Sequence, residues 1–258
     1  MKHTLIGIFL LSVTLMSGQV LDTSNPSVQA ALASTQFEGS PLANFFQKRT
    51  PAMDQLMRDV KNNGTTQNFY IGPQKGSAYE NEKFIPGKVY HGDEFLDDVY
   101  YRYNAFSDEV EVKKTTLKEE QYLALLKSED IYLISNSGKK YMYREFFDEK
   151  GDVQNGYVVP LSLGKETSLY KQYSVKFVEG KKAENSMVNP IPNRFIPTNR
   201  YLIKYEQSQK MVELPSKKKK LFKFLEKNVQ DFDAKQYAKK DIDLSSDIEM
   251  INLFNNIY

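Results

Sequence analysis

The sequence GKVYHGDEFLDDVYYRYNAFSDEVEVKK, residues 87–114, decides the fold class of this chain. Its runs 88–90 and 99–103 are rich in β-branched and aromatic residues, which favour pleated, half-buried surfaces. Turn-forming residues follow the two runs, at 91–93 and 104–108. The stretch therefore predicts consecutive β-strands joined by tight turns.

The next run, residues 109–113, alternates charged and apolar side chains with a period of two. Successive side chains of a strand point to opposite faces of a sheet. The alternation predicts that the valines face the core. The charged side chains that are then predicted to face water are Glu109, Glu111 and Lys113.

The chain as far as residue 214 continues this pattern of short segments. A short helix is predicted over 117–127. Strands are predicted from β-favouring runs between turn signals at 131–134, 140–147, 156–159, 170–178, 201–205 and 210–214. Because no βαβ alternation separates them, the predicted fold class is mainly β (α+β). We expect a curved or partly closed antiparallel sheet over residues 76–214, with C-terminal helices.

Two apolar stripes after Pro215 predict helices that pack on the same domain, over residues 215–258. The first stripe comprises Leu221, Phe222, Leu225 and Val229. The second comprises Ile248, Ile251 and Phe254. A capping box, Ser246-x-x-Glu249, marks the start of the second helix.

The N-terminal part of the chain is predicted to lie outside the sheet. Residues 1–19 are typical of a secretory signal peptide, with Lys2 before a short apolar core and small residues near the expected cleavage site. An uncleaved anchor is the alternative, but no stop-transfer pattern follows. Residues 20–49 are predicted to be a flexible leader, and residues 50–75 an N-terminal helix and loop.

The signal segment predicts an exported protein, either periplasmic or secreted. The sequence contains no cysteine, so it is neither a lipoprotein nor stabilised by disulfides. Its composition, with 40% hydrophobic residues and a formal net charge of +2, is that of a folded domain and gives no reason to expect a nucleic-acid partner.

One acidic loop, HGDEFLDD at residues 91–98, is the weak candidate for a cation site. Its ligands would be His91, Asp93, Asp97 and Asp98. Zinc usually takes nitrogen and sulfur ligands, and the loop lacks the spacing of a calcium-binding loop. The loop is therefore interpreted as an acidic hairpin turn facing solvent, and no metal or cofactor is expected.

The sequence contains no catalytic motif. A Ser–His–Asp hydrolase would depend on His91, since His3 lies in the signal segment, and no G-x-S-x-G elbow is present. A pair of carboxylates could still meet in space, although nothing in the sequence singles out two of them. A carboxylate-based envelope hydrolase therefore remains the alternative to a non-enzymatic protein.

A run of lysines is the candidate for binding an anionic surface. It comprises Lys217, Lys218, Lys219, Lys220 and Lys223. Its first four members are predicted to occupy the first turn of a helix capped by Ser216, where positive charges oppose the helix dipole. Helix stability gives no reason for that placement, whereas attraction to a membrane surface would. A solvated lysine-rich surface is the alternative.

Several segments together resemble a group of uncharacterised secreted proteins of Bacteroidota (flavobacterial) bacteria. They are GSAYENEKFIPGKVY, VYYRYNAFSDEVEVK, GYVVPL, SLYKQYSVKFVE, YLIKY and NLFNNIY, and they span residues 76–258. The resemblance implies secretion and a shared fold, and it carries no assigned activity. We expect an exported cell-envelope protein that binds a partner or an apolar ligand without catalysis, on the concave face of its sheet.

Overall fold

The computed structural model describes residues 35–46, 73–165, 167–185, 187–229, 232–238 and 242–256. The signal segment and the helix expected after residue 50 lie outside these ranges. The strands are β1 (Gln74–Lys75), β2 (Ile85–His91), β3 (Glu94–Asn104), β4 (Glu109–Lys113), β5 (Leu123–Ala124), β6 (Ile131–Ser135), β7 (Lys140–Phe147), β8 (Val153–Leu163), β9 (Thr167–Gln172), β10 (Val175–Val178), β11 (Asn193–Pro197), β12 (Arg200–Tyr205) and β13 (Lys210–Glu213). The helices are η1 (Pro41–Asn44), α3 (Lys218–Asn228), α4 (Ala234–Ala238) and α5 (Asp247–Asn255).

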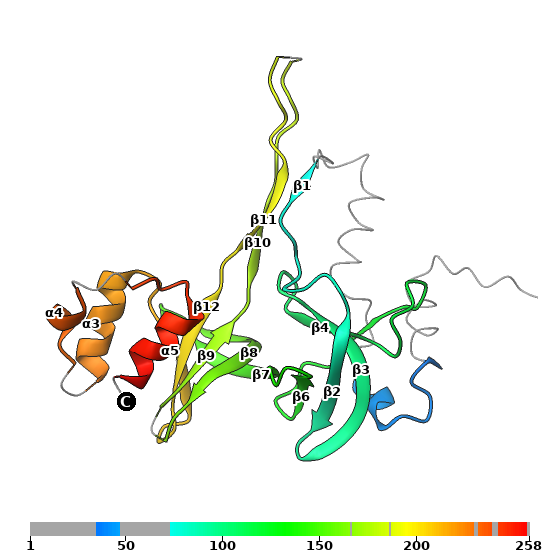
Figure 1. Cartoon of the computed structure of the whole chain (residues 1–258), viewed down its shortest axis with the longest axis horizontal. Coiled ribbons are helices and arrows are strands. Elements are labelled where there is room, and N and C mark those ends of the chain that lie inside the picture. The colour runs from blue at the N-terminus through cyan, green and yellow to red at the C-terminus, as the bar shows by residue number, and fades with distance from the viewer. Residues whose placement is uncertain are drawn as a thin grey trace, which may run out of the picture.

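The predicted curved, partly closed sheet is confirmed (Figure 1). The strand order is β13-β12-β9-β8-β7-β6-β2-β3-β4-β5, and β13 also pairs with β7 through Val212 and Phe147. This extra pairing closes β7, β8, β9, β12 and β13 into a barrel-like ring. The remaining strands extend the sheet away from the ring, and the C-terminal helices lie at the opposite end of the molecule.

The strand predicted over 170–178 is two strands in two different sheets. β9 belongs to the large sheet, whereas β10 pairs with β11 in a three-stranded arm that projects from the body (Figure 1). The break falls at Ser174, whose backbone carbonyl accepts a hydrogen bond from Thr198 at 2.7 Å and whose N–H donates to the Asn199 side chain. These bonds tie the base of the arm to the turn before β12.

The prediction that the charged side chains of β4 face water is wrong. Val110 and Val112 do face the core, but Glu109, Glu111 and Lys113 are buried as well. The alternation is real, and it was misinterpreted because both faces of this hairpin are covered. A strand covered on both faces can bury a charged side chain only where an oppositely charged or hydrogen-bonding group is in contact with it.

That partner is Arg102 on β3, whose Nε donates to Glu111 Oε2 at 2.6 Å. Asn104 donates to the other carboxylate oxygen at 3.1 Å. Three rings surround the guanidinium carbon at centroid distances of 4.0 to 4.9 Å, and they belong to Tyr79, Phe84 and Tyr122. We call these six residues the β3–β4 cluster.

The helix predicted over 117–127 is also wrong. Residues 114–120 form a loop in which the Glu120 carboxylate accepts hydrogen bonds from the backbone N–H groups of Lys114 and Thr115. β5 follows and pairs with β4, and Leu125 is fully buried. Backbone pairing with a buried strand outweighs the helix propensity of this leucine-rich run.

The described part of the expected flexible leader, residues 35–46, packs on the sheet. Phe37 and Leu42 are fully buried in the main core, and the Ser40 hydroxyl caps η1. For these residues the leader prediction is corrected: two large apolar side chains in a polar segment are enough to anchor it.

The C-terminal helices share one hydrophobic cluster with β9 and β12. On α3 the predicted residues Leu221, Phe222 and Leu225 are buried. On α5 the buried residues are Met250, Leu253 and Phe254, and Ile251 is half-buried against the same cluster. Ile248 is 72% exposed, so the second stripe is corrected at that residue. The buried residues lie at positions i, i+3 and i+4, which share one narrow face of a helix. The predicted residues lie at i, i+3 and i+6, which spread over a wider arc. None of the helices within the described ranges has the length and apolar character needed to cross a membrane.

Candidate functional site

α3 carries the predicted lysine run, but it begins later than expected. Lys217, not Ser216, is the N-cap residue, and no side chain caps this end of the helix. The backbone N–H of Ser216 instead donates to the Glu149 carboxylate at 3.1 Å, which holds Ser216 against the β7–β8 turn. Lys218, Lys219 and Lys220 therefore make up the uncapped first turn.

The ring of Phe222 forms an aromatic floor beside the lysines, and two further rings back it. The ring of Phe222 on α3 lies 6.0 Å from that of Phe232 and 6.5 Å from that of Tyr237 on α4, measured between centroids. Phe232 and Tyr237 stack at 5.1 Å with an interplanar angle of 16°. The three rings hold the short helix α4 against α3, because aromatic pairs at such distances stabilise packing beyond the area that they bury.

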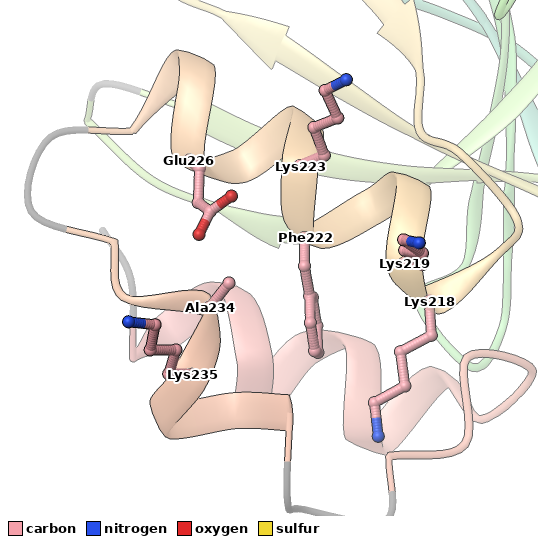
Figure 2. A pocket seen from close by; sticks show the side chains of 7 residues that line it. All are labelled: Lys218, Lys219, Phe222, Lys223, Glu226, Ala234 and Lys235. Carbon is pink, nitrogen blue, oxygen red and sulfur yellow. The ribbon is translucent and has the colours of Figure 1, made fainter.

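A cavity of about 630 Å³ opens between α3 and α4 above this floor (Figure 2). Its lining residues are Lys218, Lys219, Phe222, Lys223, Glu226, Ala234 and Lys235. Figure 2 shows Phe222 pointing from α3 into the space between the helices and Ala234 approaching from α4. We call this cavity the α3–α4 pocket.

The rim of the α3–α4 pocket is strongly cationic. Its lining includes four lysines but one carboxylate, that of Glu226, around the apolar side chains of Phe222 and Ala234. Lys218 lies over the Phe222 ring, with its Nζ 5.7 Å from the ring centroid. Lys223 extends from α3 away from the space between the two helices (Figure 2), so it lines the pocket beside α3 rather than facing Ala234. A ligand with an apolar chain and a negative head would satisfy both parts of the pocket.

The structure divides the predicted lysine run. Lys218, Lys219 and Lys223 line the α3–α4 pocket, whereas Lys220 Nζ lies 3.4 Å from the Glu149 carboxylate across the β7–β8 turn. Lys217 is the exposed N-cap. The sequence analysis missed Glu226, Ala234 and Lys235.

The candidate cation loop does not assemble a site. HGDEFLDD forms the β2–β3 hairpin, with Gly92 in the left-handed region at φ +57° and the exposed His91 ring packed 4.9 Å from that of Phe45. Among the residues with described positions, no three metal-ligating side chains come together. Asp97 and Asp98 are neighbours on a strand, so they point to opposite faces.

Each of these two carboxylates is already bound to a lysine. Lys114 Nζ donates to both oxygens of Asp97 at 2.6 Å, and Lys88 Nζ donates to Asp98 at 2.6 Å. Burial would raise the pKa of Asp97, but the hydrogen bonds from Lys114 and Ser40 outweigh it and hold the pKa below its ordinary value. The carboxylates of this hairpin therefore serve its packing.

The expected ligand site on the concave face of the sheet stays a prediction. Within the sheet, the rings of Tyr101, Tyr103, Tyr141 and Tyr157 contact one another at centroid distances of 5.5 to 6.1 Å. The α3–α4 pocket lies outside the barrel-like ring, between the helices. Comparison of the chain with protein-family models, with curated proteins and with solved structures finds no match.

Proposed function

We propose that this chain is an exported cell-envelope protein that binds an anionic amphiphile in the α3–α4 pocket without catalysis. One observation carries the proposal: the ring of Phe222, backed by Phe232 and Tyr237, forms the floor of a pocket that four lysines and one glutamate also line. The floor favours an acyl or other apolar chain, and the rim favours a phosphate or carboxylate head.

The stability of α3 does not explain why lysines gather at this end of the helix. Three lysines crowd the first turn of α3, where positive charge opposes the helix dipole. Their mutual repulsion is relieved when an anion enters the pocket. The ligand could be a free amphiphile or one that is still part of an anionic bilayer, because both present the same head group.

The proposal is tested by calorimetry with two lysolipids that share a lauroyl chain, lysophosphatidylglycerol and lysophosphatidylcholine. Only the first carries a net negative charge, so we expect it to bind more tightly. Lys219→Gln/Lys223→Gln should weaken its binding about tenfold or more, since each lysine near an anionic head contributes about 1 kcal/mol. High salt should reduce the difference between the two lipids, because salt screens exposed charges.

Two variants serve as controls. Lys181→Gln/Lys182→Gln removes the same charge from the exposed arm and should leave binding unchanged. Ala234→Phe fills the pocket and should abolish binding of both lysolipids while the circular dichroism spectrum stays the same. Equal affinity for the two lipids, or binding that survives Ala234→Phe, contradicts the proposal. Binding only to phosphatidylglycerol vesicles, and to neither lysolipid, would reduce the site to a membrane-surface contact.

Export is the second part of the proposal, and it is supported by residues 1–19 and by the resemblance to secreted Bacteroidota proteins. The mature protein is periplasmic or secreted, carries no lipid anchor, and has an anionic membrane surface or an envelope protein as its partner. N-terminal sequencing of protein from the cell envelope should find a start near Gln19. An intact Met1 on membrane-embedded protein contradicts export by a cleaved signal.

One observation favours the alternative of a carboxylate-based envelope hydrolase. Glu213 and Asp243 line the same cavity, of about 390 Å³, at the junction of β12, β13 and the segment before α5. Burial raises the pKa of Glu213, whereas hydrogen bonds from Ser245 lower the pKa of Asp243. Two carboxyl groups shifted in opposite directions suit an acid and a base. Release of reducing ends from soluble oligosaccharides, lost in Asp243→Asn, would favour the hydrolase, and no release would exclude it.

A further inference from the structure

The cavity that holds Glu213 and Asp243 has the chemistry of a binding site in its own right. It lies where the turn between β11 and β12 meets the end of β13 and the segment before α5. Its floor is apolar and buried, formed by Leu214, Leu221 and Met250. Its volume, about 390 Å³, falls in the range of small-molecule sites. We call it the β13–α5 cavity.

One wall carries a loosely paired acid and base. Arg200 Nη1 lies 3.7 Å from Glu213 Oε2, which is longer than a hydrogen bond. The Glu213 side chain is only 14% exposed, and burial raises its pKa more than Arg200 lowers it. The guanidinium of Arg200 donates hydrogen bonds and the Glu213 carboxylate accepts them. This wall can therefore bind a hydroxyl group as donor or as acceptor.

The other wall is an ionised acceptor with hydroxyl groups around it. Asp243 Oδ1 accepts hydrogen bonds from the Ser245 backbone N–H at 2.8 Å and from its hydroxyl at 2.6 Å. The hydroxyl of Ser216 lines the cavity as well. Hydrogen-bond donors and acceptors, some charged and some neutral, thus surround an apolar floor.

Other ligand classes fit this lining less well. The strands at the cavity have partners on both sides, β12 between β9 and β13, and β13 between β12 and β7, so they offer no edge to an extended peptide. A strongly anionic ligand would meet Glu213 and Asp243, and a strongly cationic one would meet Arg200. A ligand with many neutral hydroxyl groups and an apolar ring face satisfies the walls and the floor together.

We propose that the β13–α5 cavity binds a carbohydrate, as one or two sugar units of a neutral glycan. The sugar hydroxyls bridge Arg200, Glu213 and Asp243, and a C–H face of the sugar ring packs on Leu214 and Met250. The proposal is independent of the α3–α4 pocket, and it names the class of substrate on which the alternative hydrolase would act.

The test is titration of the full mature chain with maltotriose, cellotriose and triacetylchitotriose, followed by calorimetry or by NMR of the sugar. At least one of them should bind saturably. Glu213→Gln and Asp243→Asn should each weaken that binding about tenfold, because each replaces a charged or proton-sharing partner of a hydroxyl group. Thr198→Trp, at an exposed position of the rim, should block the cavity with the thermal midpoint unchanged.

Each outcome decides for or against the proposal. Loss of sugar binding in Thr198→Trp, with lysolipid binding retained, supports it and separates it from the α3–α4 pocket. Lys219→Gln/Lys223→Gln should show the reverse pattern. Sugar binding that survives Thr198→Trp lies elsewhere and overturns the proposal. Failure of all three trisaccharides to bind, or binding of trialanine in their place, also overturns it.

Discussion

The β3–β4 cluster and the α3–α4 pocket lie at opposite ends of the molecule and treat charge in opposite ways (Figure 1). In the cluster, Glu111 is fully buried, and its carboxylate oxygens are bound by Arg102 and Asn104. The pocket is lined by four lysines and one glutamate over an aromatic floor. The buried carboxylate of the cluster is matched by a cation on the neighbouring strand, whereas the lining of the pocket carries a net positive charge.

This difference separates structural charges from functional ones. Burying an ion is unfavourable unless a partner offsets the lost hydration, and the β3–β4 cluster supplies that partner on the neighbouring strand. Burial would lower the pKa of Arg102, but Glu111 outweighs it, so the pKa stays above its ordinary value. In the pocket, by contrast, Lys219, Lys223 and Lys235 are exposed to water.

The largest effect on stability is expected from Glu111→Gln. It leaves Arg102 buried among three rings without its counter-charge, and breaking a buried pair in this way typically costs about 3–5 kcal/mol. The free energy of unfolding from urea denaturation should fall by that amount. The matched control is Glu184→Gln on the exposed arm, which should change it by less than about 0.5 kcal/mol.

A double variant sharpens this test. Arg102→Met/Glu111→Leu removes both charges, so we expect it to lose less stability than Glu111→Gln alone. If Glu111→Gln proved as mild as the control, the β3–β4 cluster would not depend on the match of its charges. The contrast with the pocket would then have no energetic basis.

The sequence predicted the strands well, and it failed where tertiary cover decides the environment. Alternation in residues 109–113 placed the valines correctly. It could not show that Tyr79, Phe84 and Tyr122 cover the other face, because these residues come from segments on both sides of the hairpin. Nor could local pattern reveal that β13 returns to pair with β7 and closes the ring, since that contact joins residues 147 and 212.

The candidate site was predicted in part, for a similar reason. The unfavourable position of the lysines at a helix start singled out Lys218 and Lys219, and Lys223 was included as the next lysine of the same helix. Phe222 was recognised only as a core residue, although the same ring also forms the floor of the pocket. Lys235 lies on α4, which has five residues and is too short for any apolar periodicity to mark it.

The smallest effect on stability is expected where the largest effect on binding lies, in the lysine run itself. Replacing Lys217, Lys218, Lys219 and Lys220 by Gln removes charges that oppose the α3 dipole, a gain of a few tenths of a kcal/mol each. It also removes the exposed ion pair between Lys220 and Glu149, worth about 0–1 kcal/mol. The summed gain of about 1 kcal/mol matches or exceeds the loss, so the free energy of unfolding should stay equal or rise by no more than about 1 kcal/mol.

Single variants separate the contribution of the helix dipole from that of the ion pair between Lys220 and Glu149. Lys219→Gln should leave stability equal or slightly higher, whereas Lys220→Gln should lower it slightly, because only the second loses the bond to the β7–β8 turn. Binding of lysophosphatidylglycerol should fall for Lys219→Gln and stay unchanged for Lys220→Gln. If the fourfold variant instead lost more than about 1 kcal/mol, the lysines would be structural, like Arg102, and their charge would be matched inside the chain. A stable fourfold variant that no longer binds the anionic lysolipid requires the opposite conclusion, that the charge of this helix is kept for a ligand.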